Sequence, residues 1–116
     1  MNTHAGRKLG RPTGARMLLI RNQTLGLLKH ERICTTYAKA REVSRFAEGV
    51  LALAKKKDLS SLRRVAAAVP AWDVRKKIYD VLVPRYQARS GGVTKVLRLK
   101  PRLGDNAEMA LIKLIP

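Results

Sequence analysis

Hydrophobic residues recur at three- and four-residue spacing through the first half of the chain, as they do along one face of an α-helix. The first such segment runs from about Ala15 to His30 and predicts a helix. Its apolar face consists of Met17, Ile20, Thr24, Leu27 and Leu28. A second, longer helix is predicted from Thr36 to about Lys57. Its buried stripe is expected to comprise Val43, Phe46, Ala47, Val50, Leu53 and Ala54.

Two shorter helices are predicted next, each with a polar start and a proline stop. Asp58 is placed to cap a helix over 59–69, which Pro70 ends. Asp73 then opens a fourth helix, which Pro84 closes. The expected inward positions are Leu62, Val65 and Val69 on the third helix and Val74, Ile78, Val81 and Leu82 on the fourth.

Strand-forming residues occur in three short runs. Residues 32–36 form one brief run, whose Thr35–Thr36 pair can cap the long helix that follows. Residues 93–100 and 107–115 form two more, separated by the turn-like PRLGDN, which predicts a β-hairpin. The order is helix, strand, three helices and two strands. The predicted fold class is therefore α+β, with helices packed on a small mixed sheet.

Charge indicates what this domain binds. The chain has 116 residues with 25 Lys and Arg against 8 Asp and Glu, a net charge of +17. Such an excess repels itself in a compact chain unless a polyanion offsets it. Nucleic acid is the leading candidate, ahead of an acidic membrane surface or an acidic protein. The longest apolar run, MLLI, is too short for a membrane span or a signal peptide.

Enzymatic readings find little support in the sequence. His4 and His30 are the only histidines, and the carboxylates are scattered, so no acid–base pair or metal site is indicated. Cys34 is the only cysteine, which excludes an intrachain disulfide. It could act as a nucleophile only beside a base supplied by the fold, and a small strand residue is the favoured reading. We expect no enzyme activity, no cofactor and no small-molecule substrate.

The N-terminal stretch AGRKLGRPTGAR is cationic, rich in glycine and unable to bury a hydrophobic face. We expect residues 1–12 to form an extended basic arm that orders on RNA, attached to a single globular domain over 13–116. The acid-free start also has the composition of a mitochondrial transit peptide.

Basic residues gather in the arm, at helix ends and along the hairpin. The forked guanidinium groups of arginine can bind phosphate through two hydrogen bonds, and glycine lets the backbone approach a phosphate closely. A run such as KKK at 55–57 is equally well read as a solvated helix end. Tyr86, between two arginines, could stack on a base, although packing beneath the hairpin is favoured. The expected RNA-binding residues are Arg7, Lys8, Arg11, Arg16, Arg21, Lys39, Arg41, Arg45, Lys55, Lys56, Arg63, Arg64, Arg85, Arg89, Gly91, Gly92, Lys95, Arg98, Lys100 and Arg102.

Five stretches in order resemble the bacterial large-subunit ribosomal protein seventeen family. They are GRKLGR at 6–11, RNQTLGLLKHERICTT at 21–36, KAREVSRFAE at 39–48, LVPRYQARSGGVTKVLRL at 82–99 and LGDNAEMALIKL at 103–114. The chain departs from the family pattern at its first residues and at Ala15, Val93, Lys95 and Glu108. Because the arm aligns with the family, the resemblance favours mature protein over a transit peptide.

The resemblance implies a non-catalytic structural constituent of the large subunit. It further implies binding to 23S-type ribosomal RNA near the polypeptide exit region, beside other large-subunit proteins, on a cytoplasmic ribosome. An organellar ribosome stays open. The residues alone also suggest two other classes: a free DNA-binding regulator or nucleoid protein, and an enzyme acting on RNA. The basic residues are spread over the arm, the helix ends and the hairpin. This spread favours a protein around which RNA wraps, and it disfavours a protein that reads a single DNA groove.

Overall fold

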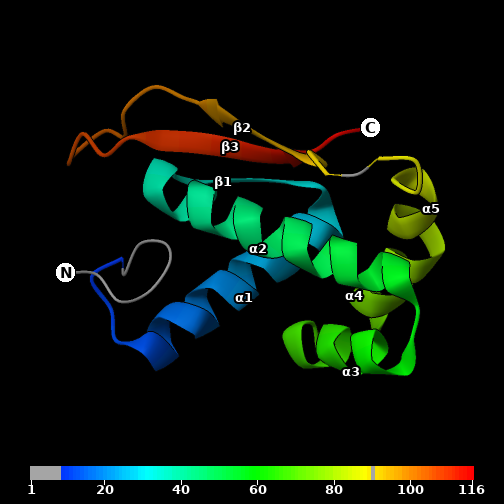
Figure 1. Cartoon of the computed structure of the whole chain (residues 1–116). Helices are drawn as coiled ribbons and strands as arrows, with labels where there is room; N and C mark the ends of the chain where they lie inside the picture. The colour runs from blue at the N-terminus through cyan, green and yellow to red at the C-terminus, as the bar shows by residue number, and fades with distance from the viewer. Residues whose placement is uncertain (1–8, 90) are drawn as a thin grey trace.

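The computed structural model describes residues 9–89 and 91–116, which form the predicted α+β fold (Figure 1). The helices are α1 (Thr13–His30), α2 (Tyr37–Lys56), α3 (Leu59–Ala68) and a continuous helical segment made of α4 (Trp72–Lys77), the π-helical turn η1 (Ile78–Leu82) and α5 (Val83–Arg85). The strands are β1 (Arg32–Thr36), β2 (Thr94–Arg98) and β3 (Met109–Leu114). None of the helices in these two ranges is long and apolar enough to cross a membrane.

The strands form one sheet in the order β1–β3–β2. Both neighbours of β3 run antiparallel to it, so the prediction of a mixed sheet is wrong. The hairpin fixes β2 antiparallel to β3, and β1 takes the remaining edge of β3. In the hairpin turn Gly104 has a φ of +104°, as the turn chemistry of PRLGDN indicates.

The helices α1 and α2 cover one face of the sheet only (Figure 1), and the hydrophobic core begins between them and the sheet. The same core continues to α3 and to the segment from α4 to α5, which contribute Val65, Val74, Ile78, Leu82 and Val83. On β3 the buried side chains alternate strictly: Ala110, Ile112 and Leu114 are buried, and the residues between them are partly exposed. The predicted stripes of the first two helices are confirmed at their buried positions, which are Ile20, Thr24, Leu27, Leu28, Val43, Ala47, Val50 and Ala54. Met17, Phe46 and Leu53 from the same stripes are only partly buried.

The predicted helix starts hold to different degrees. Asp58 caps α3 as expected, its carboxylate accepting the backbone N–H of Ser61 at 2.8 Å. Thr36 occupies the N-cap position of α2, but its side chain makes no capping hydrogen bond. Asp73 is not the cap of α4 either, because the helix begins one residue earlier and Ala71 is the N-cap. Asp73 then lies in the first turn, where a carboxylate still interacts favourably with the helix dipole.

The prediction that Pro84 closes the fourth helix is wrong, because a π-helical turn precedes this proline. The N–H of Val83 bonds to the carbonyl of Ile78, five residues back, which widens the helix just before the proline. The helix therefore continues through Pro84 to Arg85. The extra residue in that turn also shifts the inward positions, so Val83 is 2% exposed, whereas Val81, predicted to face inward, is 42% exposed.

On α3, Val65 and Val69 are buried as predicted, but Leu62 is 40% exposed. Its neighbour Ser61 is 5% exposed and takes the inward place. A hydroxyl at this buried position is tolerated beside the Asp58 cap, and the larger leucine is left on the outer side of the short helix.

Glu31 joins three parts of the fold. It ends α1 with a left-handed φ of 67°, and its N–H bonds to the carbonyl of Leu27 at 2.7 Å. Its own carbonyl accepts the N–H of Leu114 at 2.9 Å, which ties the end of α1 to the end of β3. A residue other than glycine in this conformation is under mild strain, so the contacts around Glu31 must offset that cost.

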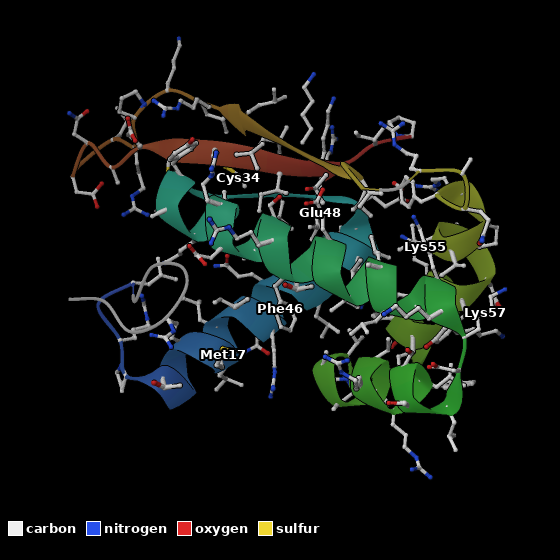
Figure 2. The ribbon with its side chains drawn as sticks, in the orientation of Figure 1. Met17, Cys34, Phe46, Glu48, Lys55 and Lys57 are labelled. Carbon is white, nitrogen blue, oxygen red and sulfur yellow. The ribbon has the colours of Figure 1, made fainter. Side chains whose placement is uncertain are left out.

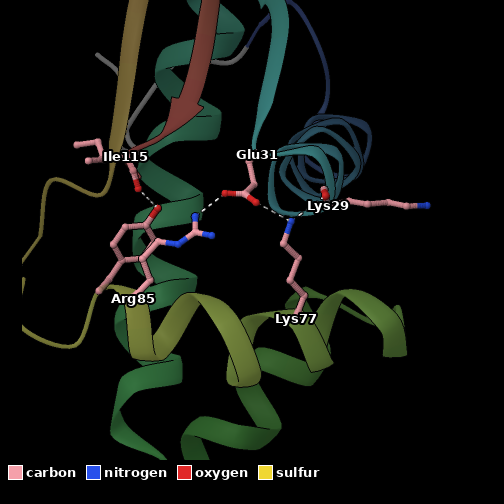
Figure 3. A network of polar contacts seen from close by, with 6 residues as sticks. Lys29, Glu31, Lys77, Arg85 and Ile115 are labelled. Atoms are coloured by element: carbon pink, nitrogen blue, oxygen red, sulfur yellow. Dashed lines mark hydrogen bonds and ion pairs between the residues drawn. The ribbon is translucent and has the colours of Figure 1, made fainter.

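The Glu31 carboxylate is the centre of a polar cluster of six residues, Lys29, Glu31, Lys77, Arg85, Tyr86 and Ile115, called the Glu31 cluster below (Figure 3). Arg85 donates to one carboxylate oxygen, and the Nζ of Lys77 lies 3.3 Å from the other. Lys77 also donates to the carbonyl of Lys29 at 2.9 Å, and the Tyr86 hydroxyl donates to the carbonyl of Ile115. The segment from α4 to α5 is thereby attached to both α1 and the sheet.

Replacing Glu31 with Gln should destabilise the protein in a pH-dependent way. Donation from the Arg85 guanidinium holds the pKa of the Glu31 carboxyl below its ordinary value of 4.5. A carboxyl whose pKa is lowered by folding adds stability above that ordinary value and loses it as pH falls through the folded-state pKa. Because the carboxylate is 37% exposed and screened, we expect Glu31→Gln to cost about 1 kcal/mol or less at neutral pH.

The measurement is urea unfolding of wild type and Glu31→Gln at neutral pH and at a pH below the folded-state pKa of Glu31, where the difference should vanish. Asp80→Asn is the matched control, since Asp80 is exposed and makes no ion pair within residues 9–89 and 91–116. A difference that stays the same at both pH values would contradict the role given to the carboxylate charge.

Candidate nucleic-acid interface

Most basic side chains are left without an acidic partner. In the part of the chain that the structure describes, ion pairs engage four basic residues: Lys77 and Arg85 with Glu31, Arg98 with Glu108, and Arg102 with Asp105. The chain has 25 lysines and arginines in all. The folded protein therefore presents a large excess of positive charge that its own carboxylates do not neutralise.

Strand register gathers three of these cations on the open face of the sheet. Arg32 on β1 is paired with Lys113 on β3, and Lys113 is paired with Lys95 on β2. Residues directly opposite one another on neighbouring antiparallel strands project from the same face, with Cβ atoms about 5 Å apart. Arg32, Lys113 and Lys95, called the cationic row below, thus line up across the whole width of the sheet.

An apolar row lies beside the cationic row on the same face. The next in-register set of side chains on this face is Cys34, Leu111 and Leu97, two residues away from the cationic row on each strand. Cys34 is exposed, and both leucines are partly exposed. Since α1 and α2 pack against the opposite face, the structure leaves this combination of cations and aliphatic surface uncovered (Figure 1).

The cationic row lowers the stability of the isolated chain. Like charges directly opposite each other in a sheet repel, by roughly 0.2–1 kcal/mol per pair. None of the three side chains makes an ion pair or hydrogen bond within the described ranges. An arrangement that costs stability and has no internal use is typical of a surface that binds an external anion.

Six of the predicted RNA-binding residues are engaged inside the protein, namely Arg11, Arg41, Lys55, Arg85, Arg98 and Arg102. Arg102 binds Asp105 through two nitrogens, at 3.1 and 2.5 Å, and this pairing lowers the pKa of Asp105 to about 2. Arg98 lies 3.6 Å from Glu108 and 4.3 Å from the centre of the Tyr37 ring. Arg41 also contacts Tyr37, with its guanidinium carbon 6.0 Å from the ring centre.

Arg11 and Lys55 bind carbonyl oxygens instead. Arg11 donates to the carbonyl of Leu9 at 2.7 Å, and Lys55 donates to that of Arg89. Their charges are unchanged by such contacts, so both remain able to attract an anion. Arg85, in contrast, has its charge offset by Glu31 at short range.

Ten of the predicted residues have side chains that make no ion pair, hydrogen bond or ring contact with any residue in the described ranges. They are Arg16, Arg21, Lys39, Arg45, Lys56, Arg63, Arg64, Arg89, Lys95 and Lys100. They come from α1, α2, α3, β2 and the loops around the hairpin, so no single helix or strand carries them all.

The remaining predicted positions divide in two. Arg7 and Lys8, in the predicted arm, lie outside the described residues. Gly91 and Gly92 are exposed, and a Cβ added at either would meet no atom within 4 Å. Gly92 has a φ of +66°, which favours glycine, so another residue there would be strained.

Tyr86 packs inside the protein, which was the favoured of its two predicted readings. Its side chain is 1% exposed, and its hydroxyl donates to the carbonyl of Ile115 at the end of β3. A buried ring cannot stack on a base. The arginine beside it, Arg85, points into the Glu31 cluster (Figure 3).

Sequence reasoning missed Arg32 and Lys113. Lys113 stands alone among apolar residues, and Arg32 directly follows the acidic Glu31, so neither was counted with a basic cluster. Only the pairing of β1 and β2 with β3 brings them beside Lys95. The alternation of β3, MALIKL, could have placed Lys113 on the open face, but not opposite two other cations.

No grouping of three or more His, Cys, Asp or Glu side chains suited to a metal ion occurs in residues 9–89 and 91–116. Cys34 lies on the open face of the sheet as an exposed strand residue, in line with its favoured reading (Figure 2). His30 is exposed in the last turn of α1.

Fold and surface together define the class of protein: a small basic α+β domain with one open sheet face and many cations that lack a partner among the described residues. Comparison with known proteins gives its family. The family described as "Ribosomal protein L17" matches residues 19–115. The chain belongs to the ribosomal protein L17 family, which supplies a structural constituent of the large ribosomal subunit.

Relatives match along nearly the whole chain. The large ribosomal subunit protein bL17 of Desulfitobacterium hafniense (strain Y51) is 46% identical over 111 residues, which are 96% of this chain and 99% of the relative. Its counterpart in Trichlorobacter lovleyi is 41% identical over 114 residues, covering 98% and 92% of the two chains. That of Endomicrobium trichonymphae is 41% identical over 115 residues, covering 99% and 98%. The resemblance found in the sequence is confirmed.

Replacing Lys113 with Gln should stabilise the isolated protein. The change removes the central charge of the cationic row and with it two cross-strand repulsions, while the first two methylene groups of the side chain are kept. We expect the free energy of unfolding to rise by about 0.5 kcal/mol at low ionic strength. The gain should shrink as salt screens the row.

Urea unfolding at low and high salt checks this expectation. Lys76→Gln is the control, since Lys76 is an exposed cation on α4 away from the sheet. If Lys113→Gln were no more stable than Lys76→Gln at low salt, the repulsion assigned to the cationic row would be absent.

Proposed function

We propose that this protein binds and stabilises large-subunit ribosomal RNA as a non-catalytic structural constituent, near the polypeptide exit region and beside other large-subunit proteins. The observation that carries the proposal is the cationic row of Arg32, Lys113 and Lys95, aligned across the open face of the sheet. Neutralising phosphates with such a row releases counterions, which supplies a salt-dependent binding free energy. The location near the exit region and the protein neighbours rest on the family resemblance alone.

The spread of charge supports RNA as the partner over a DNA duplex groove. Cations without an internal partner come from three helices, the sheet and the loops, so no single helix carries the charged surface. A groove reader instead concentrates its contacts on one element that enters the groove. RNA junctions offer phosphates from several directions, which suits a surface of this kind.

We also propose the division into a basic RNA-binding arm over residues 1–12 and a domain over 13–116. Its support in the described residues is that α1 begins at Thr13, directly after Pro12, which has extended dihedrals. Arg11 and Pro12 are exposed, so the chain leaves the domain at its surface. An arm that departs there can reach RNA beyond the surface of the domain, on a ribosome in the cytoplasm.

The wild-type protein should sediment with large ribosomal subunits in a cell lysate at moderate salt. The double variant Lys95→Gln/Lys113→Gln should be released at a lower salt concentration, because two phosphate contacts of the cationic row are lost. The matched control Lys29→Gln/Lys76→Gln removes two exposed cations elsewhere and should stay bound like wild type. Recovery of wild type only in free or DNA-bound fractions would overturn the ribosomal assignment of this chain.

Arg89 and Arg85 should contribute unequally to RNA binding. Arg89 has no internal partner for its side chain within the described ranges, whereas the charge of Arg85 is offset by Glu31. We expect Arg89→Gln to reduce the slope of log affinity against log salt by about 0.7–0.9. Arg85→Gln should reduce it by less and should lower stability instead.

The slopes are obtained by titrating a large-subunit RNA fragment at several salt concentrations, and stability is followed in parallel by urea unfolding. Equal slope changes for the two variants would show that Arg85 leaves Glu31 when RNA binds.

A further inference from the structure

A hollow of about 620 Å³ opens between α2 and α3, on the side of α2 away from the sheet. Three exposed cations contribute to its lining, namely Arg45, Lys56 and Arg64. The other lining residues are uncharged: Phe46, Gly49, Val50, Ala52, Leu53 and Ala68. These residues define the α2–α3 hollow. Its volume lies in the range of natural ligand sites.

Gly49 is the member of this lining that calls for an external explanation. It lies inside the 20-residue helix α2, where glycine lowers stability relative to alanine. A Cβ at Gly49 would meet no atom of residues 9–89 and 91–116 within 4 Å, so nothing in the described part of the chain requires the absence of a side chain. Gly49 is exposed and lines the hollow. We therefore infer that the missing side chain keeps space for a group from outside the chain.

The hollow combines a flat apolar surface with positive charge. Phe46 is the only phenylalanine of the chain, and it points from α2 away from the sheet (Figure 2). No carboxylate belongs to the lining. Glu48, two residues further on, lies on the opposite side of α2, where its carboxylate accepts the N–H of Thr94 at 3.4 Å (Figure 2). The positive charges of Arg45, Lys56 and Arg64 are therefore not neutralised by any carboxylate in the lining of the hollow.

We propose that the α2–α3 hollow takes one unpaired nucleotide of RNA, its base on the Phe46 surface and its phosphates held by Arg45, Lys56 and Arg64. This proposal rests on the proposed function and deepens it, because it names a site and a ligand class for part of the RNA contact. A nucleotide unites a flat ring and an anion in every residue, whereas a peptide would need an aromatic and an acidic residue in one matching place. Bases that leave a helix are commonly held on aromatic side chains with arginine nearby.

The test uses Gly49→Leu, which fills the hollow without changing any charge. Leucine is a good helix former at an exposed helix position, so the variant should unfold at the same or a higher temperature than wild type. The probes are an unpaired oligoribonucleotide of about 12 nucleotides and an RNA duplex of equal length. We expect the affinity of Gly49→Leu for the unpaired probe to fall about tenfold, with duplex binding unchanged.

Ala67→Leu is the matched control, because Ala67 is an exposed residue of α3 outside the lining. It adds the same side chain and should leave both affinities at their wild-type values. Phe46→Ala removes the stacking surface, but Phe46 also packs against the core, so Gly49→Leu is the deciding variant. Ultraviolet crosslinking of the wild-type complex should attach the unpaired probe to the peptide that contains Phe46.

The outcomes separate this proposal from the function on which it rests. If wild type bound neither RNA probe, the proposed function itself would fail. If wild type bound both and Gly49→Leu bound the unpaired probe equally well, only the nucleotide site would be wrong. An acidic aromatic tripeptide, Asp-Trp-Asp, that bound wild type and lost affinity in Gly49→Leu while RNA binding was unchanged would make the hollow a protein-docking site and overturn the proposal.

Discussion

The pairing of β3 with β1 on one side and β2 on the other is the constraint on which both the core and the interface depend. One register turns Ala110, Ile112 and Leu114 towards the helices and turns Lys113 outward between Arg32 and Lys95. Because side chains alternate along a strand, a slip by one residue would bury Lys113 and expose Ile112. Burial of the apolar side therefore fixes the register strongly enough to hold three like charges in line on the other side.

A second constraint is the scarcity of carboxylates. With eight acidic residues against 25 basic ones, each carboxylate that makes a structural contact leaves fewer to neutralise the surface. Glu31 connects α1 and the sheet with the helical segment that comprises α4 and α5. Asp58 caps α3, and the Glu48 carboxylate accepts the N–H of Thr94 at the beginning of β2. Asp105 and Glu108 pair with arginines near the hairpin turn. The acidic residues thus act mostly at joints of the fold, and the outer charge is left to external anions.

Local patterns predicted the elements well, because helix periodicity and strand-forming runs are properties of neighbouring residues. They failed where the outcome depends on contacts between distant segments. The π-helical turn exchanged Val81 for Val83 and carried the helix past Pro84, which periodicity at a constant 3.6 residues per turn cannot anticipate. Lys113 is isolated in the sequence and Arg32 follows an acidic residue, and both become part of a site only through the strand register. Arg85 looked like a free phosphate ligand until the fold brought Glu31 to it.

The cationic row and Gly49 have one property in common: each lowers the stability of the isolated chain, and no contact within the described residues compensates for this loss. The cationic row adds like-charge repulsion across the sheet, and Gly49 weakens the helix that carries the α2–α3 hollow. A chain optimised for its own stability would replace Lys113 with a neutral residue and Gly49 with alanine. Since both costs are local and modest, the hydrophobic core that the helices form with the sheet can tolerate them. Residues that destabilise the chain, and that no contact within the described residues explains, therefore indicate where a partner binds and what shape and charge it has.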